Sequence, residues 1–484
     1  MLHYLSKKAV HMGRIVPEID SDLAEKIADK SLNPKTLLTR RNHGHVELPA
    51  QLYAIAEEKL SRYSDRTFRN EAKLLIQVMH DLKLPDDEAT LKIKRADVKA
   101  ELEIRDKIKE PRTDVDGFQL AEEQFLVKNE LSLLIQGIVD GRRRDWHYFE
   151  YDERAALMYM ATRLAPNYAC VKTVMQEICD LDQSFKPKSV LDFGSGMGTT
   201  TWAINETWPN ESPEIMNIDI SKDQQYLCEY LLRGGKDFGD SPAGVYHRQY
   251  LPSSNRVKYD MVVAAFSLLE LPNSQLRANT IENLWNKTDD LLVIVERGNR
   301  GGFATVNEAR NFILDMSGHD VTKKLNLAPS SKPVLRRQVP SAHVFAPCPH
   351  EFICPRSLMS KKKNMDVCRF RINFEPLGFG LPKPGAIRET FSYVVLRKRP
   401  HEGFLRNDCP IRWPRIVEKQ RAGGKHIIHK LCCPNGGLAE AVITKRRHGT
   451  PMYQLARASD WGDILPIKVN DTYEVKNSKL LKSE

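Results

Sequence analysis

The chain has 484 residues, of which 41% are hydrophobic and 28% charged, and it contains no uncharged run of 18 apolar residues. This length allows two to three domains, and the composition excludes a membrane span. The net charge is +10, but residues 321–430 hold 23 Lys/Arg against 7 Asp/Glu, which predicts a polyanionic partner, with a merely solvated basic surface as the alternative.

The first 185 residues are predicted to be a leader followed by helices. Residues 1–17 are basic, lack acids and have an apolar face, which is typical of a mitochondrial presequence. Residues 18–185 show helical periodicity, so we expect a helical N-terminal region without strands. Pro166 is expected to interrupt the last of these helices.

The hydrophobic pattern of the sequence changes after residue 185. Short apolar runs alternate with helical patterns through residues 186–320, which predicts a Rossmann-like core with a doubly wound parallel sheet. The expected strands are 189–192, 214–219, 259–265 and 290–296. The expected helices are 199–207, 222–233, 274–287 and 306–316.

The last third is irregular, basic and rich in proline. Residues 321–425 are expected to complete the sheet with a strand near 391–397, and residues 426–484 to form a small C-terminal β region. Six of the nine cysteines lie after residue 340. Because the chain shows no secretory segment, metal binding is favoured over disulfides.

A glycine loop follows the first expected core strand. Its form, Gly-x-Gly-x-Gly after an aspartate, resembles motif I of class I S-adenosylmethionine-dependent methyltransferases, and an aspartate ends the next strand, where it can bind a ribose. The expected cofactor-binding residues are Asp192, Gly194, Ser195, Gly196, Gly198 and Asp219. No catalytic motif of the amino or cytosine methyltransferases follows the fourth strand; Glu270 there is a candidate base or a capping carboxylate.

Four cysteines, Cys348, Cys354, Cys368 and Cys432, suit a metal centre, with Cys433 as the alternative fourth ligand. Thiolates bind both zinc and iron–sulfur clusters, and the spacing alone does not distinguish these. In a zinc site, His343 or His350 could replace one cysteine.

Several segments together resemble the mitochondrial small-ribosomal-subunit methyltransferase-like family. They are 190–198, 265–272, 347–350, 391–396, 413–416, 431–436, 445–449 and 461–463. The resemblance implies a mitochondrial matrix protein that holds a 4Fe–4S cluster on Cys348, Cys354, Cys368 and Cys432. It also implies assembly of the small ribosomal subunit on its rRNA. We further expect a monomer that does not bind membranes.

Three functions remain open at this stage. The chain can be an assembly factor that keeps the methyltransferase fold as a scaffold with an S-adenosylmethionine pocket. It can instead be an active rRNA methyltransferase, which the intact loop and Asp219 favour. A zinc-stabilised RNA-binding protein is the third reading. Lys361, Lys362 and Lys363, between two candidate ligands, and the nearby Arg369 and Arg371 are expected to contact RNA phosphates.

Overall fold

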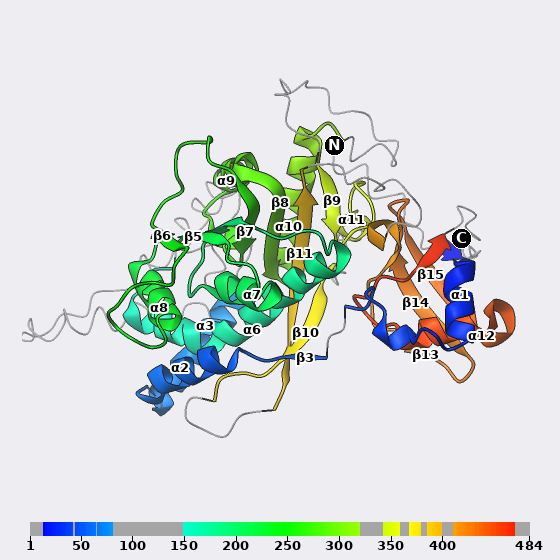
Figure 1. Cartoon of the computed structure of the whole chain (residues 1–484), viewed down its shortest axis with the longest axis horizontal. Coiled ribbons are helices and arrows are strands. Elements are labelled where there is room, and N and C mark those ends of the chain that lie inside the picture. Colours follow the sequence, from blue (N-terminus) through cyan, green and yellow to red (C-terminus); the bar gives the residue numbers. More distant parts are fainter. Residues whose placement is uncertain are drawn as a thin grey trace, which may run out of the picture.

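The structure is a computed structural model that describes residues 13–41, 44–63, 65–80, 149–319, 342–358, 367–378, 385–398 and 410–469. These residues form a large α/β lobe and a smaller β lobe beside it (Figure 1). The smaller lobe holds both the first and the last described strands. No helix in the described ranges combines the length and apolarity that a bilayer crossing requires.

A mixed nine-stranded sheet is the centre of the large lobe. Its order is β3-β10-β11-β8-β7-β4-β5-β6, with β9 paired to β11. The strands are β3 (His45–Val46), β4 (Ser189–Phe193), β5 (Glu214–Ile218), β6 (Val245–Arg248), β7 (Tyr259–Ala265), β8 (Thr288–Arg297), β9 (His343–Ala346), β10 (Phe370–Phe374) and β11 (Ile387–Arg397).

Strands β6, β5, β4, β7 and β8 are parallel, whereas β11 is antiparallel to all three of its partners, β8, β9 and β10. Counted in chain order from β4 and leaving out β9, the strands lie in the order 3-2-1-4-5-7-6. This is the order of class I methyltransferases, so the predicted fold class is confirmed. The order reverses at β4, which places its carboxyl end at the crevice where such sheets bind ligands.

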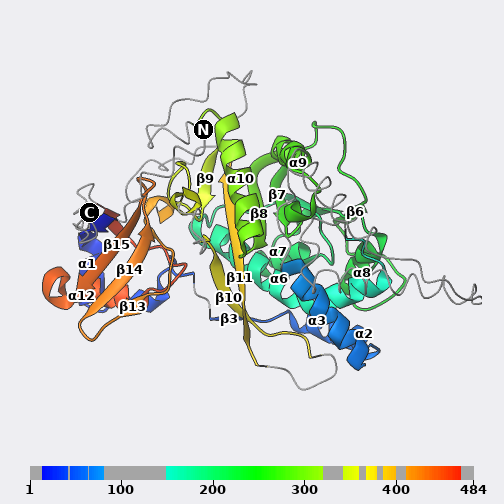
Figure 2. The same ribbon diagram turned by 180° about the vertical axis from the view of Figure 1, so that it is seen from behind.

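Helices cover both faces of the sheet (Figure 2). They are α2 (Ala50–Ser61), α3 (Arg66–His80), α6 (Glu153–Leu181), α7 (Thr199–Thr207), α8 (Lys222–Leu232), α9 (Ser274–Lys287) and α10 (Arg300–Met316). The first five pack in one apolar layer, and α9 with α10 pack in the other. Neighbouring residues of one strand enter opposite layers, as Val293 and Ile294 of β8 do, because side chains alternate across a strand.

Helix α6 corrects one expectation. It continues through Pro166 for 29 residues, although a proline removes one backbone hydrogen bond and clashes with the preceding turn, at a cost of about 3 kcal/mol. Most of α6 is buried against the sheet and its neighbouring helices. Burial on nearly every side offsets this cost.

The small lobe is built from both ends of the chain. Its sheet has the order β1-β15-β14-β12, with β13 paired to β14, and a separate pair joins β2 to β16. The strands are β1 (Gly13–Ile15), β2 (Pro17–Ile19), β12 (Arg415–Ile416), β13 (Arg421–Ala422), β14 (His426–Cys432), β15 (Leu438–Thr444) and β16 (Ile467–Val469). Helices α1 (Ser21–Ala28) and α12 (Lys445–Ala458) pack on it, and α11 (Pro355–Leu358) lies in the segment between β9 and β10.

Two expectations about the N-terminal region are therefore wrong. Strands β2 and β3 lie in the part expected to have none, and both are too short to leave a periodic signal. Residues 13–17, included in the expected presequence, belong to the small lobe, where β1 pairs with β15 in parallel. Residues 1–12 lie outside the described ranges.

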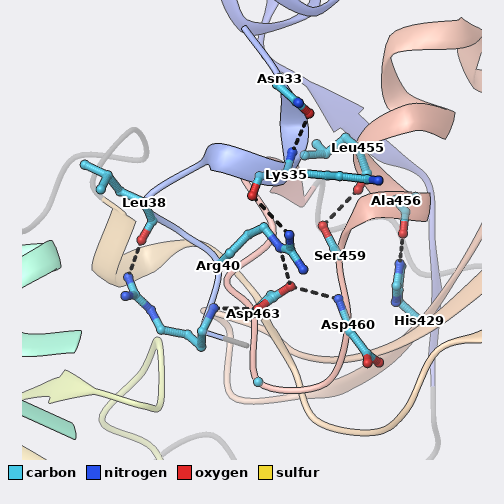
Figure 3. Close-up of polar contacts among 12 residues, drawn as sticks. Asn33, Lys35, Leu38, Arg40, His429, Leu455, Ala456, Ser459, Asp460 and Asp463 are labelled. Carbon is cyan, nitrogen blue, oxygen red and sulfur yellow. Dashed lines mark hydrogen bonds and ion pairs between the residues drawn. The ribbon is translucent and has the colours of Figure 1, made fainter. Parts of the chain in front are cut away.

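An N-terminal strap, residues 33–41, ties the small lobe to the large one, and Figure 3 shows its contact with the small lobe through Arg40 and Asp463. Asp463 accepts a hydrogen bond from the Arg41 backbone N–H at 2.6 Å and lies 3.7 Å from the Arg40 Nε. Arg41 also forms an ion pair with Asp180 of α6 at 2.7 Å. The strap thereby bonds to both lobes.

Candidate metal centre and glycine-loop crevice

The structure brings the four predicted cysteine ligands together from both lobes. Cys348, Cys354 and Cys368 line a cavity of about 20 Å³ in the large lobe. Cys432 ends β14 of the small lobe and interacts electrostatically with all three. The Nε2 of His350 lies 3.3 Å from the Cys432 Sγ. A centre at this point would join the two lobes.

Cys433 lies elsewhere, although it is the next residue. It is fully buried in the small lobe's own apolar core, which also contains Leu431 and Met452. Cys432 contacts a separate apolar group with Val417 and Leu438. Adjacent residues point to opposite sides of a strand, so this geometry favours Cys432 as the fourth ligand.

The surroundings of the cysteines are cationic. Arg310, Arg356 and Arg415 are all at most 4% exposed. Burial raises the pKa of the Cys348 thiol to about 11, against the lowering effect of the Arg310 guanidinium. Burial also raises the pKa of Cys432 well above its usual value, and the neighbouring cysteines add to this.

The surroundings of Arg310 indicate whether an anionic group fits the site. Its guanidinium donates to the carbonyls of His350 and Phe352 at 2.7 and 2.9 Å, and its Nε has no partner. Across the described ranges, no carboxylate lies within 4.0 Å of this buried cation. A buried charge needs a counter-charge, and thiolates of a metal centre would provide it. The residues present therefore fit such a centre.

The glycine loop has the conformation expected of a ligand-binding turn. Gly194, Gly196 and Gly198 all have positive φ, at 69°, 50° and 73°. A Cβ at Gly194 would lie 2.4 Å from the Ser267 Cβ, and one at Gly198 would lie 2.6 Å from the Cys228 Sγ. At Gly196 the nearest atom would be 3.8 Å away. Two glycines are thus required by packing, whereas the middle one borders open space.

Buried polar atoms without partners surround this loop. They belong to Asp192 (both carboxylate oxygens), Ser195 (Oγ) and Gln224 (Oε1), all at most 4% exposed. Burial raises the pKa of Asp192 to about 7, although the Thr200 hydroxyl nearby lowers it. Asp219 accepts from the backbone N–H groups of Gly196 and Ser221, at 2.7 and 2.9 Å. Unpaired acceptors at a topological switch point fit a ligand that carries several donors.

Tyr151, which precedes α6, bridges the crevice. Its backbone carbonyl accepts from the Ser221 Oγ at 3.0 Å, beyond the end of β5. Its hydroxyl donates to Glu270 at 2.9 Å, in the short 3₁₀ helix Leu268–Glu270 after β7. The candidate base Glu270 is therefore engaged by the chain itself, on the side of the crevice where methyltransferases usually place catalytic residues.

Glu296, near the end of β8, is 1% exposed, and burial raises its pKa to about 7. The folded state holds its proton more tightly than the unfolded state, so the free energy of unfolding should fall as pH rises from about 4.5 to 7, by about 1.4 kcal/mol per pKa unit. In Glu296→Gln this fall should become shallower, as measured by urea unfolding at several pH values. Equal pH slopes in both proteins would contradict the expectation.

The sequence did not reveal Arg310, Gln224 or Tyr151 as members of these sites. Arg310 lies on an ordinary amphipathic helix, and Gln224 and Tyr151 reach the crevice through tertiary packing. Conversely, Arg371 was expected to contact RNA but forms an ion pair with Asp460 at 3.0 Å. Lys361, Lys362 and Lys363 lie outside the described residues.

Comparison with known proteins finds a family and named relatives. Residues 153–466 match the family profile described as "Mitochondrial small ribosomal subunit Rsm22". The chain is 38% identical over 324 residues to the human "Ribosome assembly protein METTL17, mitochondrial", covering 66% of this chain and 65% of that protein. It is 26% identical to the fission yeast "Rsm22-cox11 tandem protein 2, mitochondrial", covering 67% of this chain and 45% of that protein. The matches thus span less than two thirds of these relatives.

Among solved structures, the chain resembles a putative RNA methyltransferase from Pyrococcus horikoshii, with 11% identity, a TM-score of 0.27 and coverage of 49% of this chain and 85% of the other. A magnesium protoporphyrin IX methyltransferase from Synechocystis, with bound SAM, has 15% identity, a TM-score of 0.26 and coverage of 42% and 88%. The family profile covers well over half of the chain and includes helices α6 to α10, strands β4 to β11 of the large lobe and strands β12 to β15 of the small lobe. The chain therefore belongs to the Rsm22 family of mitochondrial small-ribosomal-subunit proteins.

Proposed function

We propose that this protein is an assembly factor of the mitochondrial small ribosomal subunit, which works in the matrix as a monomer and binds rRNA. The observation that carries the proposal is the family match, which spans both lobes and the four cysteines. The relatives are named as mitochondrial ribosome assembly proteins. A presequence, in this proposal, is confined to residues 1–12, because residue 13 begins a strand.

The proposed metal centre is a 4Fe–4S cluster held by Cys348, Cys354, Cys368 and Cys432. Zinc–sulfur bonds of 2.3 Å would bring four thiolates to within about 3.8 Å of one another. Among the described residues, three metal-ligand side chains have ligand atoms that all lie within 4.8 Å of one another: His45, Glu47 and Glu375. No three of the four cysteine sulfurs lie that close together. The wider spacing favours a larger, multi-iron group over a single zinc ion.

The cluster would link the two lobes to each other. Three of its proposed ligands lie in the segment between β9 and β10 of the large lobe and the fourth ends strand β14 of the small lobe, so binding the cluster fixes the placement of the lobes relative to each other. The proposal assigns it this structural role.

The crevice is proposed to bind S-adenosylmethionine without transferring its methyl group. Asp192, Ser195 and Gln224 offer the buried polar atoms, and Asp219 keeps acceptor capacity for a ribose hydroxyl. The Tyr151 hydroxyl donates to Glu270, so the chain itself engages the candidate base that a methyl acceptor would need. The alternative, an active rRNA methyltransferase, is favoured by the intact loop and Asp219.

Gly196→Val tests this division of roles. Its side chain would enter the open space at the loop, so S-adenosylmethionine binding measured by calorimetry should be lost. In cells depleted of their own protein, the variant should still restore small-subunit levels on sucrose gradients, with unchanged rRNA methylation. Gly385→Val is the control, because its Cβ would meet no atom within 4 Å.

Two results would overturn the proposal. Loss of a specific rRNA methyl group in Gly196→Val alone would establish the methyltransferase instead. Failure of the unaltered protein to restore small-subunit levels would refute the assembly role. Gln224→Leu, which removes one unpaired acceptor and needs no positive φ, repeats the binding test should Gly196→Val not fold.

A further inference from the structure

The far end of the small lobe carries an exposed group of cations, which we call the basic tip. It consists of Arg421, Lys425, His426, Lys445, Arg446 and Arg447, all exposed. The register of β14 and β15 pairs His426 with Thr444, which brings Lys425 and Lys445 to the same edge of the sheet. The two segments are therefore one surface, although about 20 residues separate them in sequence.

The cations of the tip have few internal partners. Arg421 forms an ion pair with Glu440, whereas Lys425, Lys445, Arg446 and Arg447 form none with described residues. By contrast, several arginines that contribute to the charge of residues 321–430 are buried, including Arg356 and Arg415. Unpaired exposed cations gathered on one surface make a strong positive potential.

We propose that the basic tip binds the phosphate backbone of double-helical rRNA. This inference rests on the proposed function and assigns the contact to a surface. None of the exposed large hydrophobic residues lies in the small lobe's 410–469 segment, so the tip has no apolar side chains to insert into a bilayer and no exposed Phe, Tyr or Trp. Among its six residues the imidazole of His426 is the one ring on which a base could stack, against five Lys and Arg side chains. A surface dominated by such cations suits phosphates, which double-helical RNA presents at regular spacing.

Strand β14 connects this surface with the metal centre. It begins at His426 in the tip and ends at Cys432, about 20 Å away at a rise of about 3.3 Å per residue. A group bound at Cys432 fixes one end of the strand, and the tip is presented at the other end. The centre would therefore orient the RNA-binding surface without touching RNA.

The test uses the full-length protein and a helical fragment of small-subunit rRNA. The triple variant Lys445→Gln, Arg446→Gln and Arg447→Gln should bind roughly tenfold more weakly at moderate salt. Its log–log salt slope should be shallower by about 2 to 3, since each lost phosphate contact removes up to about 0.9. Thermal stability and metal content should not change, because all three side chains are exposed and make no ion pair with described residues.

The matched control removes the same charge from the large lobe, through Lys222→Gln, Lys236→Gln and Arg256→Gln, which are also exposed. It should bind RNA as the unaltered protein does. Equal weakening in both triple variants, or an unchanged salt slope in the tip variant, would overturn the proposal. The proposal would also be overturned if the basic tip were needed for binding to cardiolipin vesicles but not for binding to RNA. Failure of the unaltered protein to bind any RNA would instead refute the proposed function.

Discussion

Cys432→Ser is expected to empty the metal centre and to loosen the small lobe. The unaltered protein, purified without oxygen, should contain about four iron and four sulfide per chain and absorb near about 400 nm. The variant should lose both. Cys432 is the one proposed ligand from the small lobe, so its loss separates the centre from β14, and the emptied centre no longer offers Arg310 a counter-charge.

The expected loss of stability follows from the coupling of metal binding to folding. A loss of several kcal/mol corresponds to a fall in Tm of roughly 10 °C or more. Cys433→Ser is the control, because this buried thiol lies in the apolar core and should cost stability without removing iron. Iron analysis and differential scanning calorimetry separate the two effects. Stoichiometric zinc without sulfide in the unaltered protein would refute the cluster.

Five strands of the large-lobe sheet, β4, β5, β7, β8 and β11, were predictable because their signals are local, whereas β3, β6, β9 and β10 were not expected. Buried parallel strands read as short apolar runs, and four of the expected helices lie at or within one residue of their observed bounds or inside a longer helix. The glycine loop also carries its own evidence, because positive φ at three alternating positions requires glycine. Local chemistry therefore identified the crevice.

The small lobe was less predictable because its contacts are distant in sequence. Strand β1 pairs with β15 across more than 400 residues, and three residues give no usable period. The interruption expected at Pro166 was wrong for a related reason. Burial of α6 by tertiary packing outweighs the helix-breaking tendency of a proline. The charge excess of residues 321–430 also overstates the charge available to a partner. It counts Arg356, Arg371 and Arg415, which form ion pairs within the protein.

Glu177→Gln is expected to cause a comparably large loss of stability. Glu177 lies on α6 and is 2% exposed. It forms an ion pair with Arg415 of the small lobe, lies 3.7 Å from the Arg41 Nε of the strap, and accepts from the Tyr393 hydroxyl of β11. Burial alone would raise its pKa, but the Arg415 and Arg41 guanidiniums hold that pKa below its usual value.

Removing this carboxylate charge leaves Arg415 buried without an anionic partner, which costs about 3 to 5 kcal/mol. Arg415 also donates to the Pro347 carbonyl at 3.2 Å, next to Cys348, so the variant should retain less iron as well. Urea unfolding and iron analysis would measure both losses. Arg421→Gln, which breaks an ion pair on the surface, should cost less than about 1 kcal/mol and keep full iron. If Glu177→Gln lost stability but kept its iron, the ion network would hold the lobes together independently of the metal centre.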